Sequence, residues 1–418
     1  MRIWLLHIGE HLPVDGATRL FRYGYLANAF QAAGHEVLRW APTYSHIDKA
    51  HRFSEDCRVA INSRYAIQFV HSPGYRRNAG WERLRTYHVL GRRFRELATR
   101  QEQPDLIVAA IPSLEWADAA VDYGRTNQVP VVIDIRDLWP DVFLTALPMA
   151  IRRVGRYMLA PYYRLARRAC SRANGLVGVS QSYLDWGLEL AGRSRGPHDA
   201  VVPLGFEPHP TPDALLQDNV AKLRARGIDP RRPICMFAGL FERSYDVETV
   251  VRAARQLRAS GREDVQFVLC GDGAKMPKMR RLAEGLPNVH LLGWVDLTMV
   301  QAVASIAEIG LCAYADGAMQ SLPNKPFEYM AGRLAICSSL PGELTDLLHR
   351  HQCGTTYRAG DCRSMAGCLS TMLAAPDQLS RMRSAAYRVW SEKYRSQEIY
   401  ARFVDQLTKL PTPTRAAA

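Results

Sequence analysis

The chain has 418 residues, of which 47% are hydrophobic and 23% charged, the ordinary balance of a soluble globular protein. This length is more than one hydrophobic core usually holds, so we expect two domains. The net charge of +13 favours an anionic partner, which a nucleotide, an acidic membrane surface or a nucleic acid would supply.

The cysteines and the N-terminal residues indicate where in the cell the protein is located. The nine cysteines form no C-x-x-C pair and several lie in apolar runs, so we expect reduced, mostly buried thiols in a cytoplasmic protein. The first apolar run, residues 3–8, is too short for a signal peptide. No apolar run approaches the roughly 18 residues of a spanning helix. We therefore expect a soluble protein, at most peripheral at the inner face of the membrane.

The first third of the chain has the pattern of a Rossmann-like domain. Residues 3–8 predict a buried strand, a loop follows to Gly16, and residues 18–33 have the apolar spacing of a helix. Residues 36–40 predict the next strand and complete an opening βαβ unit. The loop lacks the G-x-G-x-x-G of dinucleotide-binding proteins. Further parallel strands are predicted at residues 105–110, 130–134 and 176–180.

Residues 44–100 are polar and basic, with arginines interleaved among aromatic residues. These are Arg76, Arg77, Arg83, Arg85, Arg92, Arg93, Arg95, Tyr75, Trp81, Tyr87 and Phe94. Basic and aromatic side chains together are typical of a nucleic-acid surface. A run of charge is equally typical of a helix face in water, and both interpretations stay open at this point.

The loop after residues 130–134 leaves the carboxyl end of a predicted strand, so we expect it to face a ligand. Asp137 in this loop would accept a hydrogen bond from a ligand hydroxyl or take a proton from it. The alternative is that Asp134 and Asp137 cap the following helix. Asp134, Asp137 and Asp141 also raise the question of a metal, but no D-x-D triplet occurs and we predict no metal site.

Residues 151–172 predict a basic amphipathic helix that is broken near Pro161. Its apolar stripe, which we expect to pack on the sheet, is Ile151, Val154, Met158, Tyr162, Leu165 and Ala169. Seven arginines crowd the remaining faces, so an anionic membrane surface is an expected neighbour.

A second series of strands follows a linker. Residues 207–231 are polar and contain several prolines, as a linker should. Strands are predicted at residues 233–239 and 265–270, and a third with its loop at residues 288–295. The turn of Gly271 and Gly273 lets a ligand approach the backbone.

The segment from residue 309 to residue 336 predicts a strand, a loop, a helix start and another strand. Asn324 reads as the N-cap and Pro326 as a residue near the first helical position. A helix start favours phosphate, and Lys325 adds a positive charge there. Glu328, one turn in, suits ribose hydroxyls. The segment therefore predicts a nucleoside diphosphate site, and the alternative is a surface turn with a solvated Lys-Glu pair.

This segment resembles the donor site of the GT-B glycosyltransferases of retaining family 4. The run that begins at Lys325, Lys-x-x-Glu-Tyr-Met-Ala-Gly, and the run that begins at Asp134, Asp-x-Arg-Asp-Leu-Trp-Pro, are similar to a subgroup that builds bacterial surface polysaccharides with amino or deoxy sugars. The family has a Glu-x7-Glu pattern. Glu328 matches the second glutamate, and Gln320 stands at the first, which contacts the donor sugar in the family.

The resemblance implies an α/β fold of two Rossmann-like domains facing across a cleft. The domains would be residues 1–203 and 204–394, with a helix at 395–410 packing back on the first. Relatives carry an Arg and a Lys after the glycine of the diphosphate loop; here Leu240 takes the first place, and Arg243 substitutes. The implied catalytic residues are Asp137, Arg243 and Lys325. The implied donor-binding residues are Gly16, Gly239, Gly271, Gly273, Trp294, Gln320, Asn324, Pro326, Phe327 and Glu328. The implied acceptor-side residues are Tyr75, Asn78, Arg83 and Arg136.

We therefore expect hexosyl transfer, with retention, from a nucleotide-sugar (UDP-sugar favoured) to a hydroxyl of a glycan or lipid-linked acceptor. No metal cofactor and no nucleic-acid partner are expected. Two alternatives stay open: a GT-B sugar-nucleotide epimerase or hydrolase, and a non-catalytic binding subunit, which Gln320 and the missing lysine would favour. A nucleic-acid binder rests on charge alone.

Overall fold

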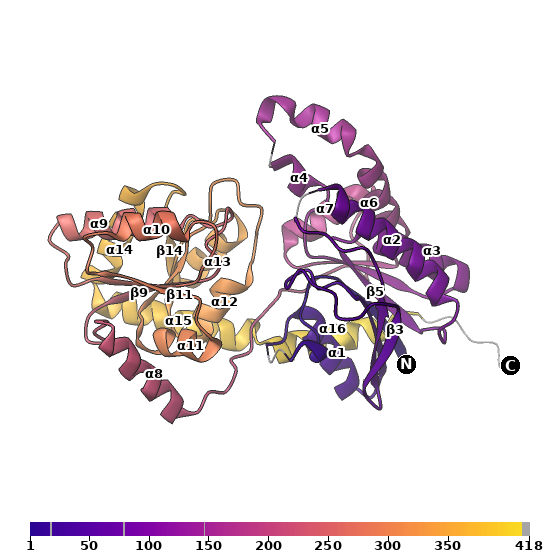
Figure 1. The fold of residues 1–418 in the computed structure, drawn as a ribbon, viewed down its shortest axis with the longest axis horizontal. Coiled ribbons are helices and arrows are strands. Elements are labelled where there is room, and N and C mark those ends of the chain that lie inside the picture. The colour runs from indigo at the N-terminus through magenta and orange to yellow at the C-terminus, as the bar shows by residue number, and fades with distance from the viewer. Residues whose placement is uncertain (17–18, 78–79, 146, 412–418) are drawn as a thin grey trace. The chain divides into compact units, whose positions relative to one another are not determined.

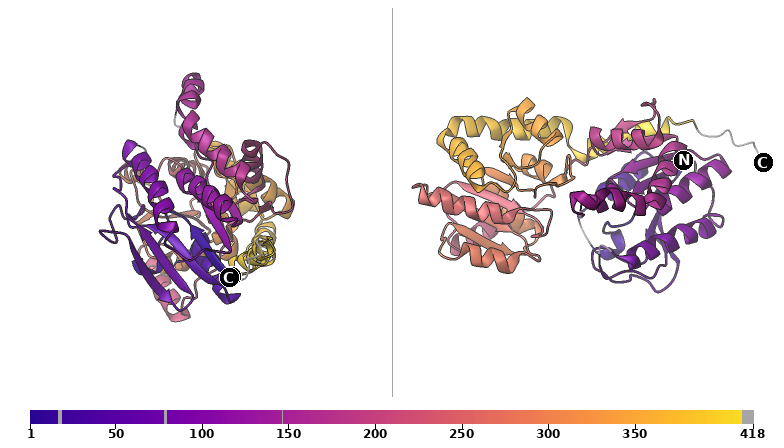
Figure 2. Two further views of the ribbon diagram at one scale, coloured as in Figure 1. Left: turned by 90° about the vertical axis from the view of Figure 1, so that its right-hand side faces the viewer. Right: turned by 90° about the horizontal axis from the view of Figure 1, so that it is seen from above.

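The computed structural model describes residues 1–16, 19–77, 80–145 and 147–411. The chain divides into two compact units, drawn in Figure 1. The first unit is Met1–Pro203 with the segment that begins at Ser396, and the second is Leu204–Arg395. Figure 2 shows further views, in which helices cover both faces of the sheet within each unit.

The first unit is built on an eight-stranded sheet of order β3-β4-β2-β1-β5-β6-β7-β8. The strands are β1 Arg2–Leu6, β2 Glu36–Pro42, β3 Cys57–Asn62, β4 Tyr65–Val70, β5 Leu106–Ile111, β6 Val131–Ile135, β7 Gly175–Gly178 and β8 Ala200–Val201. β3 pairs antiparallel with β4, and the other pairings are parallel. The strands predicted from apolar runs are confirmed, because a strand covered by helices on both faces must be apolar throughout.

The β3–β4 hairpin lies in the basic segment that the sequence analysis left without strands. Side chains of β3 alternate between half-buried and exposed, whereas β4 is almost wholly buried. A strand at the sheet edge needs only one apolar face, so its alternation is short and easily hidden among charged residues.

The helices of the first unit flank this sheet. They are α1 Arg22–Ala32, α2 Trp81–Ala98, α3 Leu114–Asn127, α4 Asp141–Thr145, α5 Arg152–Met158, α6 Ala160–Arg172, α7 Gln181–Ala191 and α16 Ser396–Thr408, with 3-10 turns η1 Pro13–Asp15 and η2 Met149–Ile151. α16 packs on α1, where the rings of Tyr25 and Tyr400 stack with centroids 5.6 Å apart. The predicted first helix begins later than expected, at Arg22, and its predicted first residue, Thr18, lies outside the described residues.

The predicted core stripe of residues 151–172 is wrong in its first half. Ile151, Val154 and Met158 are 47%, 61% and 74% exposed, so they do not pack on the sheet. The chain turns between α5 and α6, and only α6 buries its apolar face, through Tyr163, Ala166 and its neighbours. Helical spacing shows that a stripe exists but does not show what covers it.

The second unit has a six-stranded parallel sheet of order β11-β10-β9-β12-β13-β14. The strands are β9 Ile234–Ala238, β10 Gln266–Cys270, β11 Val289–Gly293, β12 Ile309–Cys312, β13 Ala335–Ser338 and β14 Gly354–Thr356. The helices are α8 Asp213–Ala225, α9 Val247–Ala259, α10 Met276–Ala283, α11 Leu297–Ile306, α12 Asn324–Ala331, α13 Glu343–His351, α14 Cys362–Ala374 and α15 Pro376–Lys393. Buried apolar side chains form one core cluster on each side of this sheet.

The segment predicted as a linker, residues 207–231, is not an extended connection. It contains α8, which packs against α11 and buries Leu223. Pro208, Pro210 and Pro212 precede the helix and Pro230 follows it, so no proline interrupts it.

Among the described residues, no helix combines the length and the hydropathy needed to cross a bilayer. The same residues contain no cluster of three or more His, Cys, Asp or Glu side chains arranged as metal ligands. All nine cysteines are free thiols, six of them buried.

Candidate functional site

The carboxyl edge of the second sheet carries three loops that backbone hydrogen bonds tie together. Gly239 follows β9, and its N–H donates to the carbonyl oxygen of Cys270, the last residue of β10, at 2.9 Å. Gly271 follows β10, and its N–H donates to the carbonyl oxygen of Gly293 at 2.8 Å. A Cβ atom at Gly271 would collide with the carbonyl oxygen of Gly239. This close approach therefore requires glycine.

Gly273, two residues after Gly271, also lies close to the backbone of the loop that follows β9. A Cβ atom there would lie 2.9 Å from the carbonyl oxygen of Phe241. The N–H of Phe241 in turn donates to the carbonyl oxygen of Asp272 at 2.9 Å. The loops thus offer a surface of main-chain atoms at which a ligand can approach the backbone.

Lys325 lies against this surface. Its side chain is largely buried, with 8% of the residue exposed, and its ammonium donates a hydrogen bond to the carbonyl oxygen of Ala238. The same ammonium lies 4.5 Å from the ring centre of Phe237 and 4.8 Å from that of Tyr245. A Cβ atom at Gly239 would come within 2.5 Å of Nζ, so the glycine makes room for the ammonium. A positive charge is therefore fixed beside the glycine loops.

The helix start at α12 differs from the predicted arrangement. Asn324 is the first helical residue and not the N-cap; Pro323 occupies the cap position, and no side chain caps the helix. Pro326 is the third helical residue, where its missing N–H costs no hydrogen bond. Among the described residues, no side chain caps the first turn of this helix, as expected of a helix start that receives an anion. Phe327 is fully buried and stacks on Tyr394 at 4.3 Å, a packing role.

Gln320 precedes this helix start in the sequence, and Glu328 follows it. Glu328 is half-buried, one turn into α12. Gln320 is also half-buried, and its Oε1 atom accepts no hydrogen bond within the described part of the chain. A buried acceptor without a partner is unfavourable, so a ligand hydroxyl at Gln320 would be favourable.

Arg243 and Trp294 lie at the carboxyl edge of the second sheet, and both are exposed to solvent. Arg243, in the loop after β9, is exposed and pairs with no other described residue. Trp294, which follows β11, is 75% exposed. The first offers a mobile guanidinium for phosphate, and the second offers a flat apolar face.

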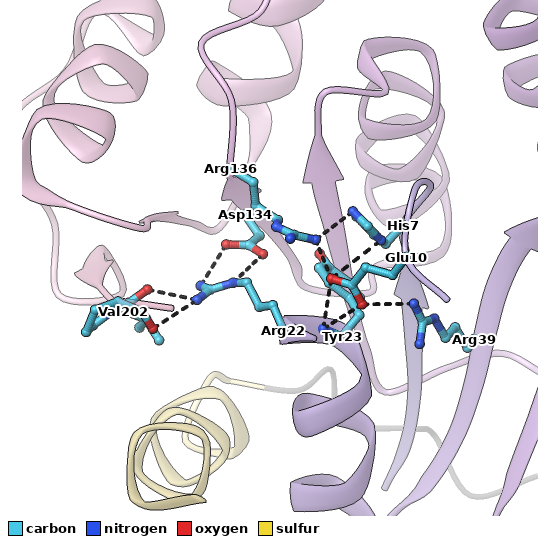
Figure 3. A network of polar contacts seen from close by, with 9 residues as sticks. His7, Glu10, Arg22, Tyr23, Arg39, Asp134, Arg136 and Val202 are labelled. Atoms are coloured by element: carbon cyan, nitrogen blue, oxygen red, sulfur yellow. Dashed lines mark hydrogen bonds and ion pairs between the residues drawn. The ribbon is translucent and has the colours of Figure 1, made fainter. Parts of the chain in front are cut away.

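The carboxyl edge of the first sheet holds a buried network of charges, shown in Figure 3. Arg22, at the start of α1, makes two hydrogen bonds of 2.8 Å to the two carboxylate oxygens of Asp134, on β6. Arg22 also donates to the carbonyl oxygen of Val202 at 2.8 Å. The hypothesis that Asp134 caps the following helix is therefore wrong, because both oxygens of its carboxylate accept hydrogen bonds from Arg22.

Glu10 is the second carboxylate of this network. It accepts hydrogen bonds from the N–H of Tyr23 at 3.1 Å, from Arg39 at 3.1 Å and from Arg136 at 2.6 Å. His7 stacks on the ring of Tyr23, with ring centroids 4.6 Å apart (Figure 3). Burial, and then the charges of Arg136, Arg39 and Arg22, lower the pKa of His7 well below its usual range. This imidazole is therefore neutral at physiological pH.

Asp137 is the accessible carboxylate next to this network. Its side chain is exposed, unlike that of Asp134. Partial desolvation raises the pKa of its carboxyl group, while the charges of Arg136 and Arg83 oppose the rise. Asp141, the third member of the metal pattern, instead accepts hydrogen bonds from Trp186 at 2.6 Å and from Tyr163. Asp134 and Asp141 thus bind different groups of the chain.

Two of the residues predicted for the acceptor side, Tyr75 and Arg83, lie together in the first unit. The Arg83 guanidinium is 5.6 Å from the ring centre of Tyr75 and 4.6 Å from that of Trp139. Arg136 points into the Glu10 network instead. Asn78 lies outside the described residues. Gly16 ends the turn η1 at a φ of +69°, with open space where a side chain would be.

The sequence analysis missed Glu10, Arg22 and His7. Arg22 and Asp134 are 112 residues apart, and Glu10 and Arg136 are 126 apart. No local pattern connects them. A charged residue in the loop after a buried strand, as Glu10 is, was an available signal, since the carboxyl ends of parallel strands meet at one edge.

Comparison with solved structures shows the architecture. Sucrose-phosphate synthase of Thermosynechococcus elongatus superposes with a TM-score of 0.72 at 15% identity, covering 98% of both chains. HepE of Anabaena in complex with UDP-glucose superposes with a TM-score of 0.66 at 14% identity, covering 98% of this chain and all of the other. The chain has the GT-B fold.

Sequence comparison adds to the GT-B assignment in the second unit. Residues 232–375 match the family model described as glycosyl transferases group 1. This range contains every loop of the site described above for the second unit. Alpha-D-kanosaminyltransferase of Streptomyces kanamyceticus is 35% identical over 101 residues, which are 23% of this chain and 26% of that protein. The match thus spans about a quarter of that relative.

Proposed function

We propose that the protein is a glycosyltransferase that moves a hexosyl residue from a nucleotide-sugar, with UDP-sugar favoured, to an acceptor hydroxyl with retention, as in family 4. The observation that carries this proposal is Lys325 fixed against the Gly239 loop, at the uncapped start of α12. An ammonium, a helix start without a capping side chain, and exposed backbone together suit a diphosphate. The UDP-glucose complex of Anabaena HepE, a protein of the same fold, supports the choice of donor.

The mechanism we propose is electrostatic. Lys325, the first-turn N–H groups of α12 and Arg243 stabilise the negative charge of the leaving diphosphate as the C1–O bond breaks. Glu328 accepts hydrogen bonds from the ribose, and Trp294 provides a face for the base. The cations of the chain thus supply the charge stabilisation, and no metal cofactor is part of the proposal.

On the acceptor side, we propose that Asp137 orients or deprotonates the attacking hydroxyl. A carboxyl whose pKa is raised, as partial desolvation raises that of Asp137, is a better proton acceptor than an ordinary aspartate. Gln320 contacts the donor sugar through its unpartnered Oε1 atom. An amide there in place of a carboxylate would change which sugar is accepted, since the amide also donates hydrogen bonds.

The setting we propose is the assembly of a bacterial surface polysaccharide or glycolipid, at the cytoplasmic face of the membrane. Support comes from α5, which Figure 1 draws at the tip of the first unit. Met149, Tyr157 and Met158 are 81%, 85% and 74% exposed. Residues 142–184 contain seven arginines and no acidic residue. Exposed apolar side chains among arginines fit an anionic lipid surface, and a lipid-linked glycan is the acceptor that such a surface would present.

The test is ligand binding followed by product analysis. Thermal unfolding would be measured with UDP, GDP, dTDP, NAD and buffer, on the wild type, on Glu328→Ala and on the exposed control Glu392→Ala. Ligand at about 100 times its dissociation constant adds roughly 2.7 kcal/mol, which raises Tm by about 2–4 °C per kcal/mol in units of this size. We expect one nucleoside diphosphate to stabilise the wild type and the control but not Glu328→Ala. A folded protein that none of them stabilises would rule out the donor site.

Product analysis separates the remaining classes of function. A nucleotide-sugar incubated without acceptor would be epimerised or hydrolysed by an epimerase or hydrolase, whereas a transferase needs the acceptor for rapid turnover. A non-catalytic subunit would bind the nucleotide and turn over no donor. It would also gain no activity when Gln320→Glu restores the family's carboxylate.

A further inference from the structure

A cluster of two cations on one aromatic ring stands in the first unit, apart from the buried Arg22–Asp134 pair. The Nζ atom of Lys49 lies 4.8 Å from the ring centre of Tyr75, and the guanidinium carbon of Arg83 lies 5.6 Å from it. Lys49 follows β2, Tyr75 follows β4 and Arg83 is in the first turn of α2. β2 and β4 are parallel neighbours, so the cluster stands at the carboxyl edge, where doubly wound sheets bind ligands.

The aromatic groups that support the two cations are rigid. Tyr75, Tyr87 and Trp139 are 5%, 2% and 3% exposed, whereas Lys49 and Arg83 are only half-buried. Arg83 donates a hydrogen bond to the hydroxyl of Tyr87 at 2.8 Å and lies 4.6 Å from the ring centre of Trp139. The guanidinium is therefore held in place while part of it faces solvent.

His46, which contacts both Tyr75 and Lys49, stays neutral. The Nδ1 atom of His46 lies 2.5 Å from the hydroxyl of Tyr75 and 3.4 Å from Nζ of Lys49. Burial, and then Lys49 and Arg83, lower the pKa of His46 to about 4. Partial burial and Arg83 also lower the pKa of Lys49. The two cations thus repel each other, and a bound anion would relieve this repulsion.

The backbone at Lys49 adds an independent sign of a constrained position. Lys49 has a φ of +56°, a region that non-glycine residues seldom adopt. Gln128 and Gln352, which share this conformation, end helices α3 and α13, whereas Lys49 lies in a loop. Non-glycine residues held in this region within loops cluster at ligand sites.

Two carboxylates close in sequence to these cations, those of Asp48 and Glu82, make hydrogen bonds to other groups. Asp48 accepts a hydrogen bond from the hydroxyl of Ser45 at 2.6 Å, and Glu82 accepts one from the N–H of Arg76 at 3.0 Å. Asp137 is the carboxylate on which the charge of Arg83 acts, and we have proposed it as the group that meets the acceptor hydroxyl. Arg83 thus brings its positive charge close to Asp137.

We propose that Lys49 and Arg83 bind a phosphoryl or diphosphoryl group of the acceptor. This inference rests on the proposed function, since it gives the acceptor its chemical class. A phosphate has several oxygens in a tetrahedral arrangement, so it accepts hydrogen bonds from an ammonium and from the fork of a guanidinium at once. The phosphate anchors the acceptor, and Asp137 receives its hydroxyl.

The experiment titrates inorganic pyrophosphate into the full-length protein saturated with UDP, by calorimetry, so that the donor site is occupied. Lys49→Met and Arg83→Met are compared with wild type and with Arg85→Met, a control that removes an exposed arginine from the same helix. We expect the dissociation constant to rise at least tenfold in the first two variants and less than twofold in the control. Affinities of all four proteins within twofold of one another would overturn the proposal.

Two readouts separate this proposal from the proposed function. UDP affinity is measured in each variant, and a tenfold loss in Lys49→Met would assign the cluster to the donor and overturn the acceptor site. If the wild type binds no UDP, the proposed function fails. The titration without UDP still decides the anion site, because the variants either lose pyrophosphate binding or retain it.

A second arm of the experiment identifies the source of the phosphate. Geranyl diphosphate and glucose 6-phosphate are titrated into the same four proteins. Binding of the prenyl diphosphate tighter than pyrophosphate, and lost in Lys49→Met, supports a lipid-linked acceptor. The same pattern with glucose 6-phosphate supports a phosphorylated sugar. Binding of both that is unchanged in Lys49→Met and Arg83→Met contradicts the proposal.

Discussion

The guanidinium of Arg22 meets both carboxylate oxygens of Asp134 at 2.8 Å, and neither side chain is exposed to solvent. The pair joins α1 to β6 and, through the carbonyl oxygen of Val202, to the chain just before it leaves the first unit. Removing one partner of a buried pair leaves the other charge without compensation, which destabilises proteins by roughly 3–5 kcal/mol.

Arg22→Met and Asp134→Asn should therefore each lower the unfolding free energy of the first unit by about 3–5 kcal/mol. Urea unfolding followed by tryptophan fluorescence measures this, because six of the eight tryptophans lie before residue 203. Arg58→Met, an exposed arginine on β3, should change stability by less than about 0.5 kcal/mol. The double variant should lose less than the sum of the two single variants, and full additivity would contradict the pairing.

Gly239→Ala tests the room that this glycine leaves for Lys325. A Cβ atom would come within 2.5 Å of Nζ, so the ammonium must move away from the loop. We expect UDP affinity to fall at least tenfold, about 1.4 kcal/mol, by calorimetry. Gly261→Ala is the matched control, since Gly261 also has a positive φ but open space around it. Equal UDP affinities of the two variants would show that the position of Lys325 does not matter for the nucleotide.

Glu115 predicts a pH dependence of stability. This carboxyl is buried in α3, and burial raises its pKa from 4.5 to about 7. The folded protein thus keeps a proton that the unfolded chain has already lost. The stabilisation is complete below pH 4.5 and is lost as the pH rises through 7.

Glu115→Gln keeps the side chain neutral at every pH. We expect it to be more stable than the wild type at pH 8, by up to roughly 3 kcal/mol, and within about 1 kcal/mol of it at pH 5. Urea unfolding at the two pH values measures the difference. Glu55→Gln, an exposed glutamate of the same unit, should show no such pH dependence. A Glu115→Gln difference that is the same at both pH values would contradict the titration.

The exposed apolar side chains of α5 predict binding to lipid. In sedimentation with large vesicles, we expect the protein to bind phosphatidylglycerol and not phosphatidylcholine alone, and to release in high salt. Tyr157→Ser with Met158→Ser should weaken binding about tenfold or more, because each buried apolar side chain contributes roughly 1.5–3 kcal/mol. Leu240→Ser, which removes a 62% exposed side chain from the second unit, is the control. If the double variant and Leu240→Ser bound the vesicles equally well, α5 would not be the part of the protein that contacts lipid.

The fold could be predicted from the sequence wherever burial acts on both faces of an element. The runs at β1, β5 and β6 are apolar throughout because helices cover both sides of these strands. The prediction failed where burial acts on one face or where the covering element is distant in sequence. α5 has the spacing of a core helix but is exposed, and β3 is an edge strand with only weak alternation.

Only part of the candidate site could be predicted from the sequence. Gly239, Gly271 and Lys325 could be singled out, because glycines after strands and a lysine at a helix start have local signatures. The bond between Lys325 and the backbone of Ala238 could not, since the two are 87 residues apart. Glu10 and Arg22 were missed for the same reason, and only the folded sheet brings their partners to them.

The packing of α16 on α1 makes the first unit discontinuous in the chain. A ribosome releases α1 early, but the helix that covers its apolar face emerges only after the whole of Leu204–Arg395 has been synthesised. Until then, the apolar face of α1 in the nascent first unit stays uncovered. Exposed apolar surface of this kind binds chaperones and aggregates with other chains. Completion of the first unit is thus tied to synthesis of the second, so a ribosome that stops before Ser396 leaves a first unit that cannot close.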